Sequence, residues 1–174
     1  MGFGKAFGFS LIAFVGINFL FVIITETIIG DLNSLFSDIT ANPLVLLFIF
    51  FGPIISMPGT VVSNMYVSIA SGVYDAMFIG TIIRLIGYIV SPFIASLIAG
   101  KTGEKKGGSL GGWFLTAIVS SLAIGLLVFI YPAILSYYLL PVGIETFVLS
   151  LLGGVVNGIF YGTFALLFTR IEPY

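Results

Sequence analysis

The chain has 174 residues, of which 59% are hydrophobic and only 7% charged, and it carries a net charge of −1 with no cysteine or histidine. These absences exclude disulfides, iron–sulfur clusters, thiolate zinc sites and haem held by histidine or cysteine. A soluble domain carries about 25% charged residues, so this composition predicts a multi-pass cell-membrane protein: one all-helical integral membrane domain over residues 1–174.

Four segments have the roughly 20 apolar residues that a helix needs to cross the hydrocarbon core. The first, residues 6–29, is longer than the apolar core of a signal peptide and has no A-x-A cleavage pattern, so we expect a retained span. The other three predicted spans are residues 76–99, 113–131 and 146–169. Between them we expect loops, including an acidic one near residues 30–40 and a glycine-rich turn over residues 101–112.

The segment 42–72 is also apolar, but Gly52, Pro53, Pro58 and Gly59 interrupt it. Proline inside a helix removes a hydrogen bond and kinks or ends the helix. Two interpretations follow: one bent crossing, which would be a kinked fifth span, or a re-entrant helical hairpin that enters and leaves on one side.

Charge placement favours the hairpin. The 101–112 segment carries Lys101, Lys105 and Lys106 against Glu104 alone, so the positive-inside rule predicts that it is cytoplasmic. With a hairpin, the N-terminus and the C-terminus also fall on the cytoplasmic side, and the acidic loop falls outside. A single bent crossing would reverse the N-terminal half and break the rule there.

Small residues recur at four-residue spacing on three predicted spans. Such stripes allow close helix packing in lipid, either within one bundle or against another subunit or a second copy of the chain. The stripes consist of Gly154, Gly158 and Gly162; Ala117, Ser121 and Gly125; and Ser91, Ala95 and Ala99.

Arg84 is the one basic residue within a predicted span. At 100° per residue it shares a helix face with small and polar residues such as Gly80, Gly87 and Tyr88, which points it into the protein. Asp75 lies on the opposite face, so Glu26 near the end of the first span is the expected partner. The pair would either hold the bundle together or form part of a solute site, because an intramembrane charge has a functional role by default.

Asn18 and Asn157 lie near the middle of the first and last spans. Interhelical hydrogen bonds account for both residues. The more specific hypothesis is a polar cavity lined by Asn18, Arg84, Tyr88, Asn157 and Tyr161, to which the broken segment would add free backbone groups.

No catalytic motif is found: the sequence lacks a P-loop, GxSxG, HExxH and paired acidic residues, and no serine has a visible base. We therefore expect no enzyme, no catalytic residue, no metal site and no cofactor. The small net charge indicates no nucleic-acid partner. The expected partners are the lipid bilayer and other membrane subunits or a second copy, with a small-molecule ligand as a further option.

Two functions remain. The first is a non-catalytic accessory or structural subunit of a larger membrane complex, which fits the many small-residue faces and the lack of an extramembrane domain. The alternative is a solute-binding or transport component with a cavity around Arg84. The length, helical character and broken segment loosely resemble the substrate-binding subunits of energy-coupling-factor importers. That resemblance is architectural: those subunits usually have six spans, and no diagnostic motif of theirs occurs here.

Overall fold

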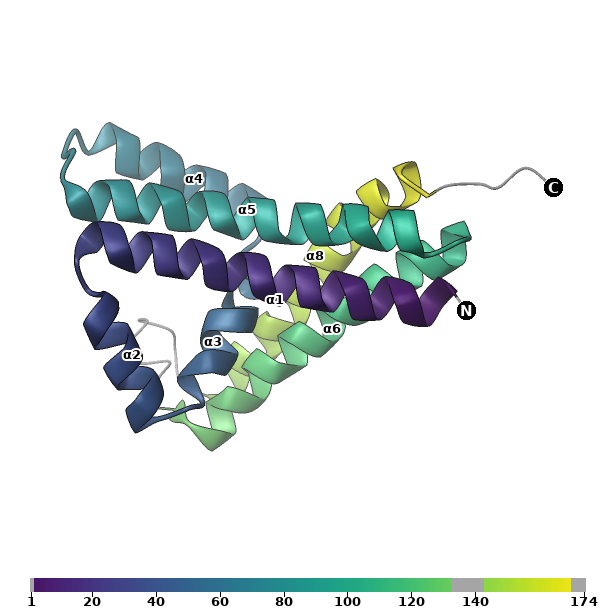
Figure 1. Ribbon diagram of the computed structural model, residues 1–174, viewed down its shortest axis with the longest axis horizontal. Coiled ribbons are helices and arrows are strands. Elements are labelled where there is room, and N and C mark those ends of the chain that lie inside the picture. The colour runs from purple at the N-terminus through teal and green to yellow at the C-terminus, as the bar shows by residue number, and fades with distance from the viewer. Residues whose placement is uncertain (1, 133–142, 170–174) are drawn as a thin grey trace.

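The computed structural model describes residues 2–132 and 143–169, and every regular element within these ranges is a helix (Figure 1). The elements are α1 (Gly2–Ile29), α2 (Leu32–Ala41), α3 (Val45–Phe51), the 3-10 helix η1 (Gly52–Ile55), α4 (Pro58–Ala70), α5 (Ala76–Thr102), α6 (Lys106–Ile130) and α8 (Ile144–Leu167). By length and composition, α1, α5, α6 and α8 are able to cross a membrane. The all-helical class and the four long apolar helices are thus confirmed, while the membrane assignment rests on composition.

Helices α1 and α5 lie antiparallel along their whole lengths (Figure 1). Gly80 near the start of α5 packs against Ile29 at the end of α1, and Gly87 packs against Phe21. At the other end Gly2 lies against Gly103. We call this the lysine end of the bundle because Lys5, Lys101, Lys105 and Lys106 lie there, and the opposite end, with Asp31, Asp38 and Asp75, the acidic end.

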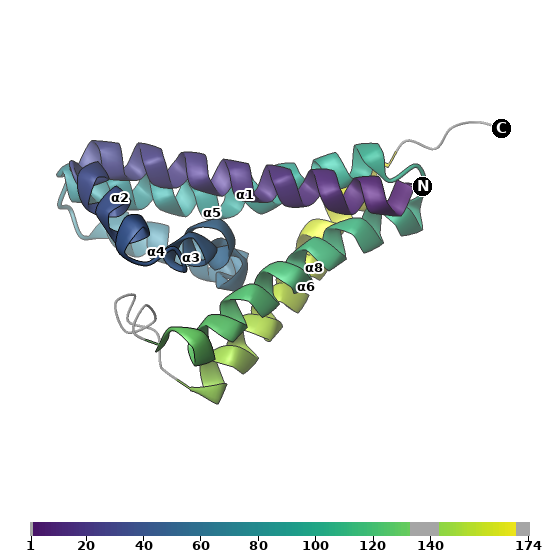
Figure 2. The ribbon, with the colours of Figure 1, turned by 60° about the horizontal axis from the view of Figure 1, so that its bottom comes forward.

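Helices α6 and α8 form a second antiparallel pair, which diverges from the first like the arms of a V (Figure 2). The two pairs touch at the lysine end, where Gly112 of α6 packs on Ala6 and Phe7 of α1, and Gly100 of α5 packs on Ala165 of α8. Towards the acidic end the arms separate (Figure 2), and α3 and η1 contact both pairs there, whereas α4 packs along α5.

The broken segment leaves and returns at the acidic end. Because Ile29 and Gly80 are in contact, the connection between α1 and α5 begins and ends at the same end of the bundle. Within it α3 and η1 run inward, the chain bends by 97° before Pro58, and α4 runs back along α5. The connection thus contains two short apolar helical segments that meet at this bend.

The prediction of a loop is wrong for two segments, both of which are largely helical. The expected glycine-rich turn over 101–112 is almost entirely helical, since α5 continues to Thr102 and α6 already begins at Lys106. Gly108 provides close packing instead of a turn, because a Cβ there would collide with the carbonyl oxygen of Gly103. The acidic loop is the amphipathic helix α2, which is stabilised by the buried Leu35.

The small-residue stripes are covered by the chain's own helices. A Cβ at Gly154 would lie 2.5 Å from Ser121 Cβ, and Gly158 packs against Phe114 and Ala117. Gly162 meets Leu110, and Gly125 meets Phe147 of α8. Ser91, Ala95 and Ala99 of α5 are fully buried. These contacts match the packing within one bundle, and they leave the stripes unavailable to a second chain.

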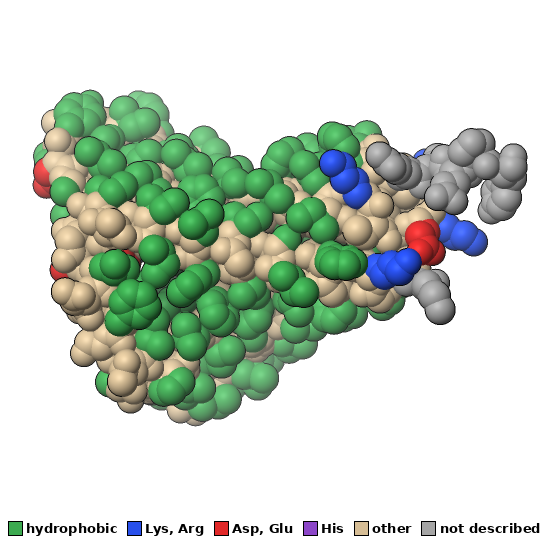
Figure 3. All heavy atoms as spheres, in the orientation of Figure 1, with side chains coloured by type: hydrophobic (Ala, Val, Ile, Leu, Met, Phe, Trp, Pro, Cys, Tyr) green, Lys and Arg blue, Asp and Glu red, His purple; other side chains and the backbone are tan. Residues whose placement is uncertain are grey.

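Apolar side chains cover the surface between the two ends (Figure 3). Lysine and arginine side chains gather at the end of the bundle where the N-terminus lies, and acidic side chains mark the opposite edge (Figure 3). Lys5 and Glu104 form an exposed ion pair at 3.3 Å across the lysine end. The hydrogen bond from Lys5 lowers the pKa of the Glu104 carboxyl, and desolvation only partly opposes that shift. Arg170 lies outside the described residues.

Candidate functional site

Arg84 and Glu26 form an ion pair between α5 and α1, with 2.5 Å between Arg84 Nη2 and Glu26 Oε1. Arg84 lies eight residues into α5, which is about 12 Å along the helix axis. The Glu26 side chain is 16% exposed and that of Arg84 34% exposed, so the pair is largely but not fully withdrawn from the surface. Arg84 Nε is buried and has no hydrogen-bond partner within residues 2–132 and 143–169.

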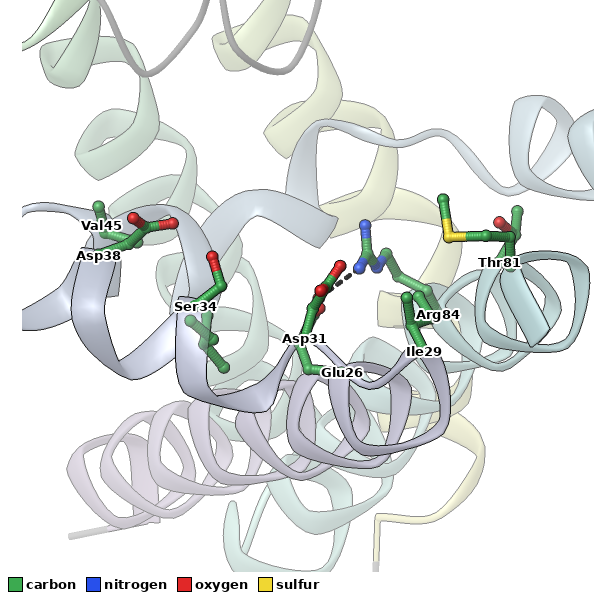
Figure 4. Close-up of a pocket in the computed structure, with 10 residues that line it drawn as sticks. Glu26, Ile29, Asp31, Ser34, Asp38, Val45, Thr81 and Arg84 are labelled. Atoms are coloured by element: carbon green, nitrogen blue, oxygen red, sulfur yellow. Dashed lines mark hydrogen bonds and ion pairs between the residues drawn. The ribbon is translucent and has the colours of Figure 1, made fainter.

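The pair forms the inner wall of a cleft of about 220 Å³ at the acidic end. Figure 4 shows Asp38 and Ser34 of α2 on one side, Glu26 and Arg84 in the centre, and Thr81 of α5 on the other side. Asp31 also lines the cleft, so three carboxylates share it with one guanidinium group. The remaining lining residues are Ile29, Leu35, Val45 and Met77.

Helix α2 supplies most of the polar wall. Asp31, Ser34 and Asp38 are spaced by three and four residues, which places them on one face of a helix. All three are exposed, whereas Leu35 of the same face is buried beneath them. The cleft therefore runs inward from exposed acidic groups on α2 to the half-buried pair. Their spacing indicates a shared face only once this segment is known to be a helix, so these residues could not be assigned to a site while it was expected to be a loop.

A smaller cavity of about 30 Å³ lies on the inner side of the pair. Glu26, Leu35 and Arg84 line both spaces, so the ion pair and Leu35 separate them. The inner cavity is bounded by Phe48, Pro53 and Tyr88, with Val22 and Ile49 completing the wall. It thus reaches from the ion pair towards the break between α3 and η1.

Asn18 and Asn157 contact the hairpin instead of either cavity. Asn18 Nδ2 donates to the carbonyl oxygen of Phe50 at 2.8 Å. Asn157 Nδ2 donates to the carbonyl oxygens of Ile54 and Ser56, at 2.6 and 3.2 Å. These carbonyls belong to the end of α3, to η1 and to Ser56 directly after it, where regular helical partners run out. Irregular backbone at membrane depth is tolerated when protein groups satisfy it, and the two asparagines provide that.

An aromatic layer lies next to the asparagines on the side of the lysine end. Trp113 is fully buried and makes edge-on contacts with Phe14 and Tyr161, with ring centroids 6.2 and 6.1 Å apart. Its indole Nε1 donates to the main-chain carbonyl of Asn157 at 3.4 Å. This layer closes the bundle core between the hairpin and the lysine end.

The structure therefore divides the predicted polar site. Arg84, Glu26 and Tyr88 come together at the two cavities, whereas Asn18, Asn157 and Tyr161 line neither of them. Asp75 is not a partner of Arg84: it caps α5 by accepting a hydrogen bond from the Phe78 amide at 2.8 Å. Among the described residues no group of three or more His, Cys, Asp or Glu side chains is arranged to hold a metal ion.

No protein-family model matches this sequence, and neither the curated proteins nor the solved structures contain a significant match to the chain. The architectural resemblance to the substrate-binding subunits of energy-coupling-factor importers thus has no support from sequence or fold comparison.

Proposed function

We propose that this chain is a membrane-embedded solute-binding protein, and that the cleft at Glu26 and Arg84 receives a small polar solute. The observation that carries the proposal is the cleft of about 220 Å³ whose inner wall is an ion pair about one third of the way along an apolar bundle. A charge at such depth is expensive in lipid and marks a functional site by default.

The charges of the cleft define the solute. Three carboxylates against one guanidinium group give the cleft an excess of negative charge, which attracts cations from solution. Arg84 Nε still lacks a hydrogen-bond acceptor. A small amine is complementary to the carboxylates, and an amino-acid-like zwitterion whose carboxylate reaches Arg84 is complementary to both features. A simple anion would meet Asp31 and Asp38 at the entrance and be repelled.

Topology supports access from one side. If the positive-inside rule holds, the lysine end is cytoplasmic, the segment 42–72 is a re-entrant hairpin and the cleft opens on the opposite side of the membrane. The aromatic layer at Trp113 and the glycine contacts close the other route. The cleft would then collect solute from outside, either for transport or for delivery to a partner.

The test is a thermal-unfolding screen of the purified protein against three panels: small amines, amino acids, and simple carboxylates. We expect members of the first two panels to raise the unfolding temperature, and simple carboxylates to have no effect. A positive compound should lose its effect in a Glu26→Gln, Arg84→Met double variant, because that variant removes both charges without leaving one unpaired.

The accessory-subunit function is tested in the same preparation. Exposed apolar residues on α4, including Val62, Tyr66 and Val67, offer a face that lipid or another subunit would cover. Mild solubilisation followed by mass spectrometry identifies co-purifying chains. A stoichiometric membrane partner together with no response to any panel would overturn the solute-binding proposal in favour of the subunit function.

A further inference from the structure

Among the described residues, three buried side-chain oxygen atoms have no hydrogen-bond partner: Asn18 Oδ1, Ser91 Oγ and Asn157 Oδ1. Their residues are at most 2% exposed. An unpaired polar atom in a protein interior costs about 1–3 kcal/mol, so each one calls for an explanation. None of the three residues lines the cleft or the inner cavity.

The three oxygens come from three helices that surround the break in the hairpin. Asn18 of α1 and Asn157 of α8 bind carbonyls only four residues apart, those of Phe50 and Ile54. Ser91 follows Gly87 by one turn of α5, and Asn18 precedes Phe21 by less than one turn of α1. Because Gly87 packs on Phe21 and the helices are antiparallel, Ser91 and Asn18 lie at nearly the same depth. We call Asn18, Ser91 and Asn157 the polar layer.

Exchanging the oxygen and nitrogen positions of either asparagine amide would not give its unpaired oxygen a hydrogen-bond partner. Both Nδ2 atoms already donate to main-chain carbonyls, and an exchanged amide would place oxygen against oxygen there. The amide oxygens are therefore fixed as acceptors. The carboxyl end of α3 and η1 also faces this layer, and the end of a helix carries partial negative charge.

We propose that the polar layer binds one dehydrated alkali-metal cation. Amide, hydroxyl and main-chain carbonyl oxygens are hard, neutral ligands, and broken helices in membrane proteins supply such groups to monovalent ions. Divalent cations favour carboxylates. Glu26, the nearest acid on α1, is eight residues from Asn18, which is about 12 Å along the axis. The neutral donor set thus favours a single positive charge over two.

Trp113 fluorescence allows a direct measurement of cation binding to the polar layer. It is the only tryptophan in the chain, and its indole donates to the main-chain carbonyl of Asn157. The purified protein is titrated with NaCl or KCl replacing choline chloride at constant ionic strength, without solute. We expect a saturable change in Trp113 fluorescence and a rise in unfolding temperature with an alkali cation. Identical curves in alkali and choline chlorides would overturn the proposal and leave a water molecule as the occupant.

The variant Ser91→Ala distinguishes cation binding at the polar layer from cation binding at the acidic cleft. The Ser91 hydroxyl makes no hydrogen bond in the described part of the chain, so removing it should leave the fold intact while weakening the cation response at least about 10-fold. The matched control is Ser96→Ala, another fully buried serine of α5 whose hydroxyl binds the Phe93 carbonyl. An alkali response that Ser91→Ala leaves unchanged would overturn the proposal, because the ion would then bind elsewhere, such as at Asp31 and Asp38. Neither result depends on whether the cleft binds a solute.

Discussion

Asn157 of α8 holds the tip of a hairpin that lies about one hundred residues earlier in the chain, by donating to the carbonyls of Ile54 and Ser56 at 2.6 and 3.2 Å. Asn157→Ala would leave both carbonyls without this donor in an apolar core, at about 1–3 kcal/mol each. Asn18→Ala removes one such bond. In detergent, the unfolding temperature of Asn157→Ala should therefore be lower than that of Asn18→Ala, and both should be lower than that of the wild type. Equal stability of all three proteins would contradict this role.

Breaking the Glu26–Arg84 pair on one side should destabilise the bundle. Arg84→Ala leaves the Glu26 carboxylate unpaired, and because the pair is partly exposed we expect a loss of about 1–3 kcal/mol, less than the roughly 3–5 kcal/mol of a fully buried pair. The Glu26→Gln, Arg84→Met double variant should recover most of it, because no unpaired charge remains. Denaturant unfolding measures the free energy of unfolding of the wild type, Arg84→Ala and the double variant. Failure of the double variant to recover would mean that the charges themselves stabilise the fold.

Close packing at Gly154 predicts a strong response to one methyl group. In Gly154→Ala the new Cβ would lie 2.5 Å from Ser121 Cβ and 3.1 Å from the Ala117 carbonyl oxygen, so α6 and α8 must separate. We expect a loss of about 1–3 kcal/mol, relieved in part by Ser121→Gly. Gly16→Ala on α1 is the control, since nothing lies within 4 Å of its Cβ position. There alanine should stabilise the helix by up to about 1 kcal/mol.

The Lys5–Glu104 pair predicts a small pH-dependent effect at the lysine end. Because the folded pKa of Glu104 lies below its ordinary value of 4.5, the pair stabilises the fold above that pH and loses its effect as pH falls through the folded value. The difference in unfolding temperature between the wild type and Glu104→Gln should therefore vanish in acid. A difference that persists there would show that Glu104 acts by something other than its charge.

The proposed topology predicts labelling from opposite sides of the membrane. The chain has no native cysteine, so single cysteines report without background. Ser37 on α2 is exposed at the acidic end, and Gly107 at the lysine end has open space around it. Ser109 is unsuitable because it is buried and donates to the Gly100 carbonyl. Labelling of Ser37→Cys and Gly107→Cys from the same side would reject the hairpin topology.

The sequence was sufficient for features that depend on a single helix or on the scarcity of charge. The four long helices follow from apolar length. The Glu26–Arg84 pair follows from helical geometry and from how few charges lie in the predicted spans. The inward face of Arg84 could be predicted too, because Gly80 and Gly87 share it and both are buried in the structure.

Other features depend on tertiary contacts that no local pattern contains. The acceptors of Asn18 and Asn157 are main-chain carbonyls, and which carbonyls are free depends on where η1 ends. Helix α2 looks like a loop because Gly30, Asp31 and Asn33 favour turns, and burial of Leu35 overrides that preference. The glycines between 101 and 112 resemble a turn for the same reason, until their close contacts with α1 and α5 are known.

In the V-shaped arrangement, a small rotation at the end where the helix pairs touch produces a larger displacement at the end where they diverge. The two helix pairs touch at the lysine end and diverge towards the acidic end (Figure 2). A helix as long as α5 extends about 40 Å, so a rotation of about 5° at the glycine contacts would move its far end by about 3.5 Å. A displacement of that size is comparable to the diameter of a water molecule. Small adjustments among Gly103, Gly108 and Gly112 would therefore be amplified into a change in the space between the two helix pairs, where α3 and η1 contact both of them.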